Sequence, residues 1–378
     1  MQGWYEANKG LVGLEQDVHD GEQGRLLSGL ARLMKQLDLT QIPASAIRDV
    51  VMPSGLVSEK EIISLLLLRA VQLEGSISHH FHWVHPHKVL EVDMEFGRRG
   101  SGTGEMARPG GICISKDGRI FLADGANHRV QAFDLRGRFL YSLGSEGHGV
   151  GQLQRPRDVC LTKDDDIVVA DTGNHRIQIF RRDQTIAVVG MGQGNELGQM
   201  NKPSGVAVLK DGKLVVADSD NHRIQIFNQD GSVHKCFGRA GTQEGEFKEP
   251  RAVAINSQDE ILVGDTNNHR IQVFDCKGQL KRCFGKLGNN NSEFRMPRKI
   301  AIAPYDDFVV ADKINNRIQV FTSDGTFVQS YTGGDTDNFN APVGVAVGPE
   351  GRVYVTQFGN DRVTVLVARR KDVTPCQP

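Results

Sequence analysis

The stretch from Pro203 to Phe227 reads PSGVAVLKDGKLVVADSDNHRIQIF, and variants of this pattern recur along most of the chain. Each copy has a proline, an apolar run, a short turn, a second apolar run ending in Ala-Asp or a variant, and then Asn-His-Arg-Ile-Gln or a variant. The opening prolines are spaced by 47 residues with a last interval of 45, and they are Pro109, Pro156, Pro203, Pro250, Pro297 and Pro342. A period of this size, built from short β runs, is typical of a radial β array.

Four antiparallel strands in each of six units predict an all-β, six-bladed β-propeller over residues 88–368. In the first repeat we expect strands at 111–115, 119–123, 129–133 and 139–144. The sixth repeat supplies only three strands, at 343–347, 352–356 and 362–367. We expect its fourth strand at residues 88–96, because Gly97 lies as far before Pro109 as Gly144 lies before Pro156. Such closure would cover two otherwise exposed strand edges.

The first 75 residues have a helical rather than a β pattern. Apolar residues from Leu26 to Leu37 recur at helical spacing, and Ser58 with Glu61 forms a capping box for a helix through Leu73. We therefore predict a small helical module over 1–75, a His-rich linker over 76–87 and a flexible tail over 369–378. The five histidines between His79 and His87 could bind a transition metal or form a plain polar linker.

The composition limits the class of protein. The formal net charge is −1, which argues against a general polyanion binder. Cys113 and Cys160 take the same repeat position, where other repeats carry Ala, so we interpret them as small core residues. No apolar run approaches the 18 residues of a membrane span. We expect a reduced, soluble, cytoplasmic protein without a membrane partner.

An Asp, an Asn and an Arg recur at fixed spacing in the turn after the second apolar run. Asn suits a turn because its side chain can mimic a backbone turn and it tolerates positive φ. The Asp and the Arg can pair across the turn in a charge-assisted hydrogen bond. We interpret the set as architecture, because it repeats in successive units: Asp124, Asn127, Arg129, Asp171, Asn174, Arg176, Asp218, Asn221, Arg223, Asp265, Asn268, Arg270, Asp312, Asn315 and Arg317.

These motifs resemble the NHL repeat over residues 88–368, as found in RING-bearing NHL ubiquitin ligases. The resemblance implies a rigid propeller that serves as a docking surface for protein partners or RNA. Residues 47–63 are similar to the end of a BACK domain, which in its family follows a cullin-recruiting BTB domain. This second resemblance implies that ubiquitin-ligase components could bind through the helical N-terminus, while the propeller selects the substrate.

The propeller topology places the connectors before the prolines and the Asp-to-Arg turns on one face, which we call the motif face. Acidic runs at 164–166, 259–260 and 306–307 belong to turns on the opposite face, so we expect the motif face to be basic. It would suit an acidic protein segment or single-stranded RNA, although few aromatic residues are free for base stacking. The predicted partner-binding residues are Arg108, Arg155, Arg157, Lys202, Arg251, Arg298 and Lys299.

Catalysis is not expected. Some NHL-like propellers are lyases or lactonases with a metal on the axis, but the axial positions here offer one carboxylate, Asp158, and one amine, Lys299. That pair does not make a metal site, so we predict no catalytic residue, metal or cofactor. The leading hypothesis is a non-enzymatic scaffold that recruits a protein in a ubiquitin-ligase pathway. Single-stranded RNA binding and a metal-dependent lyase are the alternatives.

Overall fold

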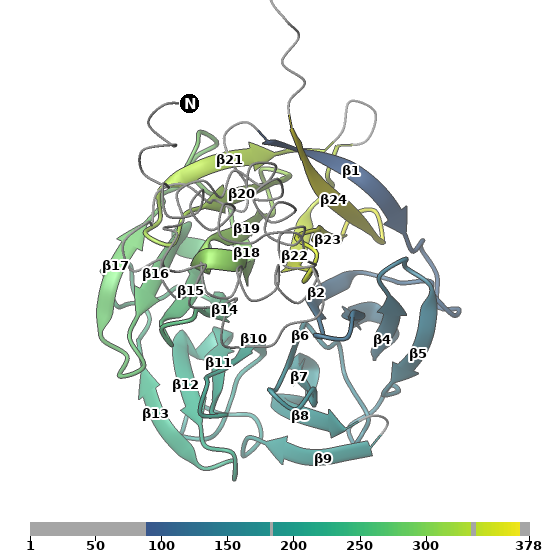
Figure 1. Cartoon of the computed structure of the whole chain (residues 1–378). Helices are drawn as coiled ribbons and strands as arrows, with labels where there is room; N and C mark the ends of the chain where they lie inside the picture. The colour runs from purple at the N-terminus through teal and green to yellow at the C-terminus, as the bar shows by residue number, and fades with distance from the viewer. Residues whose placement is uncertain (1–87, 182–183, 334–337, 371–378) are drawn as a thin grey trace, which may run out of the picture. The chain divides into compact units, whose positions relative to one another are not determined.

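The computed structural model describes residues 88–181, 184–333 and 338–370. Six four-stranded antiparallel sheets stand around a common axis as the blades of a propeller (Figure 1). The predicted helical module, the His-rich linker and residues 371–378 of the predicted tail lie outside the described residues. No helix within the described ranges is long and apolar enough to cross a bilayer.

Each of the first five blades uses four consecutive strands, numbered outward from the axis. Blade 1 contains β2 Pro109–Ile114, β3 Arg119–Asp124, β4 Arg129–Asp134 and β5 Phe139–Leu143. Blade 2 contains β6 Asp158–Leu161, β7 Ile167–Asp171, β8 Arg176–Arg181 and β9 Gln184–Val189. Blade 3 contains β10 Pro203–Val208, β11 Leu214–Asp218, β12 Arg223–Phe227 and β13 Val233–Phe237. Blade 4 contains β14 Pro250–Ile255, β15 Ile261–Asp265, β16 Arg270–Phe274 and β17 Leu280–Phe284. Blade 5 contains β18 Pro297–Ile302, β19 Phe308–Asp312, β20 Arg317–Phe321 and β21 Phe327–Tyr331.

Blade 6 joins the two ends of the propeller (Figure 1). It consists of β22 Pro342–Val347, β23 Val353–Gln357, β24 Arg362–Arg370 and, outermost, β1 Lys88–Phe96. The β1–β24 register runs from Lys88 opposite Arg370 to Phe96 opposite Val363. The predicted end of the last strand at 367, and the tail predicted from 369, are therefore wrong by a few residues. The strand continues because β1 supplies hydrogen-bond partners as far as Arg370.

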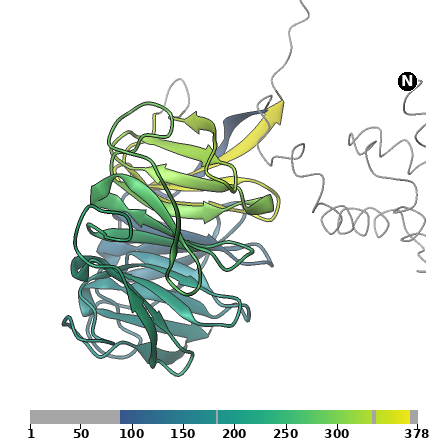
Figure 2. The same cartoon turned by 90° about the vertical axis from the view of Figure 1, so that its left-hand side faces the viewer.

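The hydrophobic core lies between neighbouring blades. In β7, for example, every residue from Ile167 to Asp171 is buried. One core cluster combines Ile224 of blade 3 with Val253 of blade 4, and Phe274 packs with its ring centroid 5.0 Å from that of Phe237. Burial of one such side chain contributes about 1.5–3 kcal/mol. Side-on, the sheets lie stacked against one another (Figure 2), so each blade is stabilised mainly by its neighbours.

Near the axis the innermost strands approach so closely that some positions require glycine. A Cβ added at Gly344 of β22 would lie 2.4 Å from the Gly110 carbonyl oxygen of β2. The Thr356 hydroxyl donates to the same oxygen at 2.6 Å. Because real Cβ contacts are not this short, a side chain here would push two blades apart.

The turns of the repeat motif differ from the prediction in one respect. Asn127 lies within a 3-10 turn, η1 Gly125–Asn127, and the following His128 adopts the left-handed conformation with φ 57°. The turns η2 Thr172–Asn174, η3 Ser219–Asn221 and η4 Thr266–Asn268 are built in the same way. Positive φ thus belongs to the residue after the Asn, because the Asn side chain is held by hydrogen bonds inside the blade.

Candidate partner-binding face

A buried aspartate organises the motif face of each of the first five blades. In blade 3, Asp218 Oδ2 accepts from Asn221 Nδ2 at 2.9 Å, Arg223 Nε at 2.7 Å and Gln225 Nε2 at 3.0 Å. Asp218 Oδ1 accepts from the Asn201 backbone N–H at 2.7 Å. The equivalent Asp–Arg distances in blades 1, 2, 4 and 5 are 2.9, 2.8, 2.8 and 2.9 Å. These four donors explain how a carboxylate with no solvent exposure is retained. The glutamine is the member that sequence reasoning missed.

The histidine of the repeat motif links each blade to the next. The Arg155 backbone N–H donates to His128 Nδ1 at 3.3 Å, and the Glu249 N–H donates to His222 Nδ1 at 3.0 Å. The fifth and sixth repeats lack the histidine, and Asn316 and Asp361 accept the corresponding bonds at 2.8 and 2.7 Å. Both partners in each bond have positive φ, so the contact fixes two strained backbone positions at once.

Blade 6 departs from the motif because Gln357 replaces the aspartate. Gln357 accepts from the Asn340 N–H at 2.9 Å and the Asn360 amide at 2.9 Å, so part of the network is kept. Arg362 pairs instead with Glu95 of β1 at 2.9 Å. The motif arginine of the last blade thereby ties β24 to the first described strand.

The motif face has a pocket of about 370 Å³ at the propeller axis. Six of the seven predicted partner-binding residues line it: Arg108, Arg155, Arg157, Arg251, Arg298 and Lys299. The seventh, Lys202, is not among the lining residues, and its ammonium group lies 2.7 Å from Asp220. Phe358, which sequence reasoning missed, contributes an aromatic wall, with Lys313 Nζ 5.1 Å from its ring centroid. Seven of the lining residues are therefore cationic.

Lys299 lines this pocket but does not supply a free charge. Its Nζ lies 2.6 and 2.7 Å from the two carboxylate oxygens of Asp158, and both side chains are buried. Burial raises the pKa of Asp158. Burial lowers the pKa of Lys299, but the attraction of the Asp158 carboxylate outweighs this effect, so the pKa of Lys299 is raised overall. We treat the pair as ionised, because the Val159 and Val206 N–H groups also donate to the carboxylate.

The other cations of the pocket are incompletely neutralised. Arg251 is paired with Glu249, but within the described part of the chain Arg157, Arg298 and Lys313 have no ion-pair partner. Burial, followed by repulsion from Arg251 and Arg157, lowers the pKa of Arg298 to about 9. Burial and the three arginines lower the pKa of Lys313 to about 8. The mouth of the axis is thus a region of concentrated positive potential.

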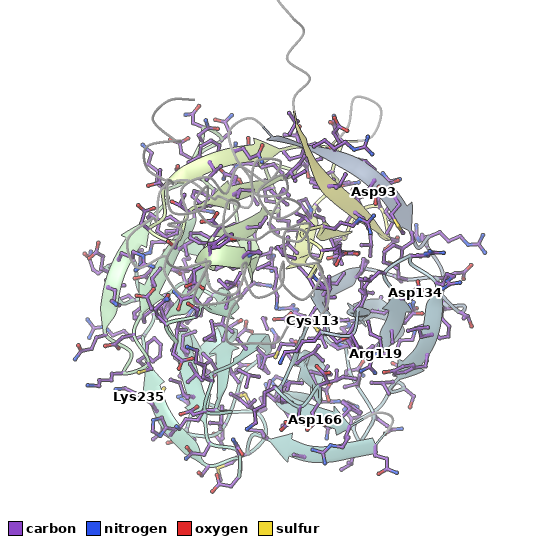
Figure 3. All side chains as sticks on the ribbon, in the orientation of Figure 1. Asp93, Cys113, Arg119, Asp134, Asp166 and Lys235 are labelled. Carbon is purple, nitrogen blue, oxygen red and sulfur yellow. The ribbon has the colours of Figure 1, made fainter. Side chains whose placement is uncertain are left out.

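Two thiols lie close to the axial ion pair. Burial raises the pKa of the Cys113 thiol, and it raises the pKa of the Cys160 thiol to about 12. The positive charge of Lys299 opposes both of these shifts. Figure 3 shows Cys113 on the inner side of its blade, whereas Asp93 and Lys235 lie toward the rim. High pKa values make both thiols poor nucleophiles at neutral pH. The described residues contain no group of three or more His, Cys, Asp or Glu side chains able to hold a metal ion.

With this geometry established, comparison with known proteins defines the class of repeat. The NHL repeat model matches residues 106–133, 153–180, 200–227, 247–274 and 294–321. The protein is therefore a six-bladed β-propeller that contains five NHL repeats. A segment of 47 residues is 51% identical to Protein lin-41 of Caenorhabditis elegans, and 46 residues are 41% identical to the E3 ubiquitin-protein ligase TRIM71 of Rattus norvegicus. Each match covers 12% of this chain, and 4% and 5% of the respective relative.

Solved structures share the fold at low sequence identity. A streptogramin B lyase aligns with a TM-score of 0.53 and 15% identity over 75% of this chain and 98% of its own. A gluconolactonase of Xanthomonas campestris aligns with a TM-score of 0.55 and 15% identity over 75% of this chain and 97% of its own. At this identity the likeness establishes the propeller architecture alone.

Proposed function

We propose that this protein is a non-enzymatic scaffold whose motif face binds an acidic segment of a protein partner. The axial pocket carries the proposal, because Arg157, Arg298 and Lys313 converge there without an ion-pair partner among the described residues. A ligand with negative charge would relieve their mutual repulsion. The blades around the pocket are fixed to one another by the histidine links, so the cations are pre-organised for binding.

The matched relatives suggest the cellular pathway in which this interaction takes place. One matched relative is an E3 ubiquitin-protein ligase, although the matched segments span only 4% to 6% of the curated relatives' lengths. We infer that the propeller serves as the substrate-recognition part of a cytoplasmic ubiquitin-ligase pathway. The BACK-like resemblance of residues 47–63 supports attachment to ligase components through the N-terminal region.

Single-stranded RNA is the second candidate ligand of the same face. It is favoured by Phe358, whose ring lies 5.9 Å from Arg108 Cζ and 5.1 Å from Lys313 Nζ at the edge of the pocket. An aromatic ring beside two cations can stack a base while the cations contact phosphates. A single phenyl ring within the pocket lining is a small platform, so we rank RNA below an acidic protein segment.

Proximity labelling of the full-length protein in cells tests the proposal. An Arg157→Ala/Arg251→Ala/Arg298→Ala variant should lose specific protein partners that the wild-type protein labels. The matched control Arg136→Ala/Lys163→Ala/Lys277→Ala removes the same charge from exposed turns of the opposite face and should keep them. Binding of a labelled oligouridylate to the same proteins is measured at several salt concentrations. An affinity that falls steeply as the salt concentration rises would indicate that the ligand is RNA. Equal partner sets for wild type and the first variant would refute docking at this face.

A further inference from the structure

The pocket lies on the motif face at the propeller axis. Its lining includes the Lys299–Asp158 pair, in which a buried ammonium group neutralises a buried carboxylate. The pair therefore presents little net charge to the pocket, and Asp158 does not strongly repel an anion. The volume of about 370 Å³ lies at the lower end of small-molecule pockets. It suits one functional group and the side chain that carries it.

Four of the cations that line this volume come from three blades. Arg157, Arg251 and Arg298 each follow the opening proline of blades 2, 4 and 5, and Lys313 begins the Asp-to-Arg turn of blade 5. Arg157 Nη1 donates to the Ser204 hydroxyl at 3.0 Å, which orients its guanidinium group. The pKa values of the half-buried Arg298 and Lys313 are lowered, first by burial and then by neighbouring arginines. The pocket therefore has excess positive charge.

Two of these arginines also have unused hydrogen-bond donors. The Nε atoms of Arg251 and Arg298 are buried and have no hydrogen-bond partner among the described residues. Buried donors without partners are rare in native structures, because each loses its hydration without replacement. A ligand with several acceptor oxygens could satisfy both donors.

We propose that the pocket binds a phosphomonoester group, presented as a phosphorylated serine or threonine of the protein partner. This inference rests on the proposed function. A phosphomonoester has a charge of −1.5 to −2 and three terminal oxygens, and arginine forks match its geometry in a bidentate manner. A carboxylate has one charge and two oxygens, so it would leave more of the positive charge of Arg157, Arg298 and Lys313 uncompensated. A phosphodiester of RNA also has only one charge.

Titration calorimetry with capped tripeptides tests the inference on the full-length protein. The probes are acetyl-Gly-Xaa-Gly-amide with phosphoserine, glutamate or serine at Xaa. We expect the phosphoserine peptide to bind at least about tenfold more tightly than the glutamate peptide, since its group is doubly charged. Arg298→Met should weaken phosphopeptide binding at least about tenfold, and Arg298→Lys should weaken it too because the fork is lost. Lys202→Ala, which removes a cation outside the pocket lining, should change it less than about twofold.

Further probes separate the sources of the phosphate. Inorganic phosphate should bind more weakly than the phosphopeptide, and decauridylate without a terminal phosphate should not displace it. Equal affinity for inorganic phosphate would overturn the peptide assignment, and displacement by decauridylate would overturn it in favour of RNA. Equal, Arg298-dependent binding of the glutamate and phosphoserine peptides would refute the phosphate inference and leave acidic docking intact. Absence of binding by either peptide would refute both, provided thermal unfolding shows that the protein is folded.

Discussion

Lys299 of blade 5 and Asp158 of blade 2 form an ion pair whose distances are 2.6 and 2.7 Å, although 141 residues separate them in sequence. In a ring of six, blades 2 and 5 are opposite each other, so the pair crosses the axis. It connects two blades that are not neighbours in the ring. Loss of this ion pair should therefore affect both the stability of the fold and the pocket that the pair lines.

Breaking this pair should destabilise the protein strongly. Lys299→Met leaves a buried carboxylate without its counter-ion, and we expect a loss of about 3–5 kcal/mol in the free energy of unfolding. The double variant Asp158→Ala/Lys299→Met removes both charges and should recover most of that loss. Urea unfolding measures both values. If Lys299→Met were as stable as the wild type, the ion pair would not stabilise the fold.

We expect Arg298 to lower the free energy of unfolding of the ligand-free protein, because its charge is suited to ligand binding rather than to the fold. Its side chain is half-buried with a fully buried Nε, repelled by two arginines and without an ion-pair partner in the described ranges. Arg298→Met should therefore raise the free energy of unfolding by about 1–2 kcal/mol.

Arg317 of the same blade is the matched control for that substitution. It is buried and bonded to Asp312 and to the carbonyl oxygens of Asn289, Asn290 and Glu293. Arg317→Met should lower the free energy of unfolding by about 3–5 kcal/mol. If both variants lost stability equally in urea titrations, Arg298 would have a structural partner after all.

The histidine links should make the propeller sensitive to acid. Burial is the main cause that lowers the pKa of His175 and of His269. A lowered folded-state pKa means that the neutral ring stabilises the fold above the unfolded value of about 6.5, and that this contribution is lost as pH falls through the folded value. Protonated Nδ1 could no longer accept from the Lys202 or Met296 N–H.

Asparagine offers a non-titrating replacement, because Asn316 accepts the equivalent bond in blade 5. His175→Asn/His269→Asn should lose less stability than the wild type between pH 7 and pH 5, as followed by the urea midpoint. The charged neighbours remain unchanged in this comparison, and they are Lys202, Asp218, Asp220, Lys248, Asp265, Arg295 and Asp312. Parallel pH profiles would show that other groups cause the acid response.

A methyl group at the axis should disturb the packing of blades 6 and 1. Gly344→Ala places a Cβ 2.4 Å from the Gly110 carbonyl oxygen, and we expect a loss of about 1–3 kcal/mol. Gly102→Ala is the control, because its added Cβ meets only side-chain atoms of Glu105 at 2.9 Å or more and no backbone atom. Thermal unfolding should separate the two variants clearly. Equal transition temperatures would mean that the inner strands can move apart at little cost.

Sequence alone predicted the propeller and its blade number, and six of the seven predicted partner-binding residues line the axial pocket. Each of the first five repeats contains its own turns, strands and Asp–Arg pair, so local chemistry is enough to define these blades. The position of Gly97 relative to Pro109 predicted the strand at residues 88–96, which pairs with β24 in the structure. Lys202 has the same predicted partner-binding role as the other six residues but does not line the pocket, because a repeat position does not reveal how far a side chain lies from the axis.

Tertiary structure alone decided which charges are paired and which are free. Lys299 and Arg298 are adjacent in sequence, yet one is neutralised by Asp158 across the ring and the other has no ion-pair partner among the described residues. The histidine links likewise join different blades. A repeat pattern determines each blade, because its hydrogen bonds are local. Contacts between blades depend on the closure of the whole ring, which brings distant residues to one axis.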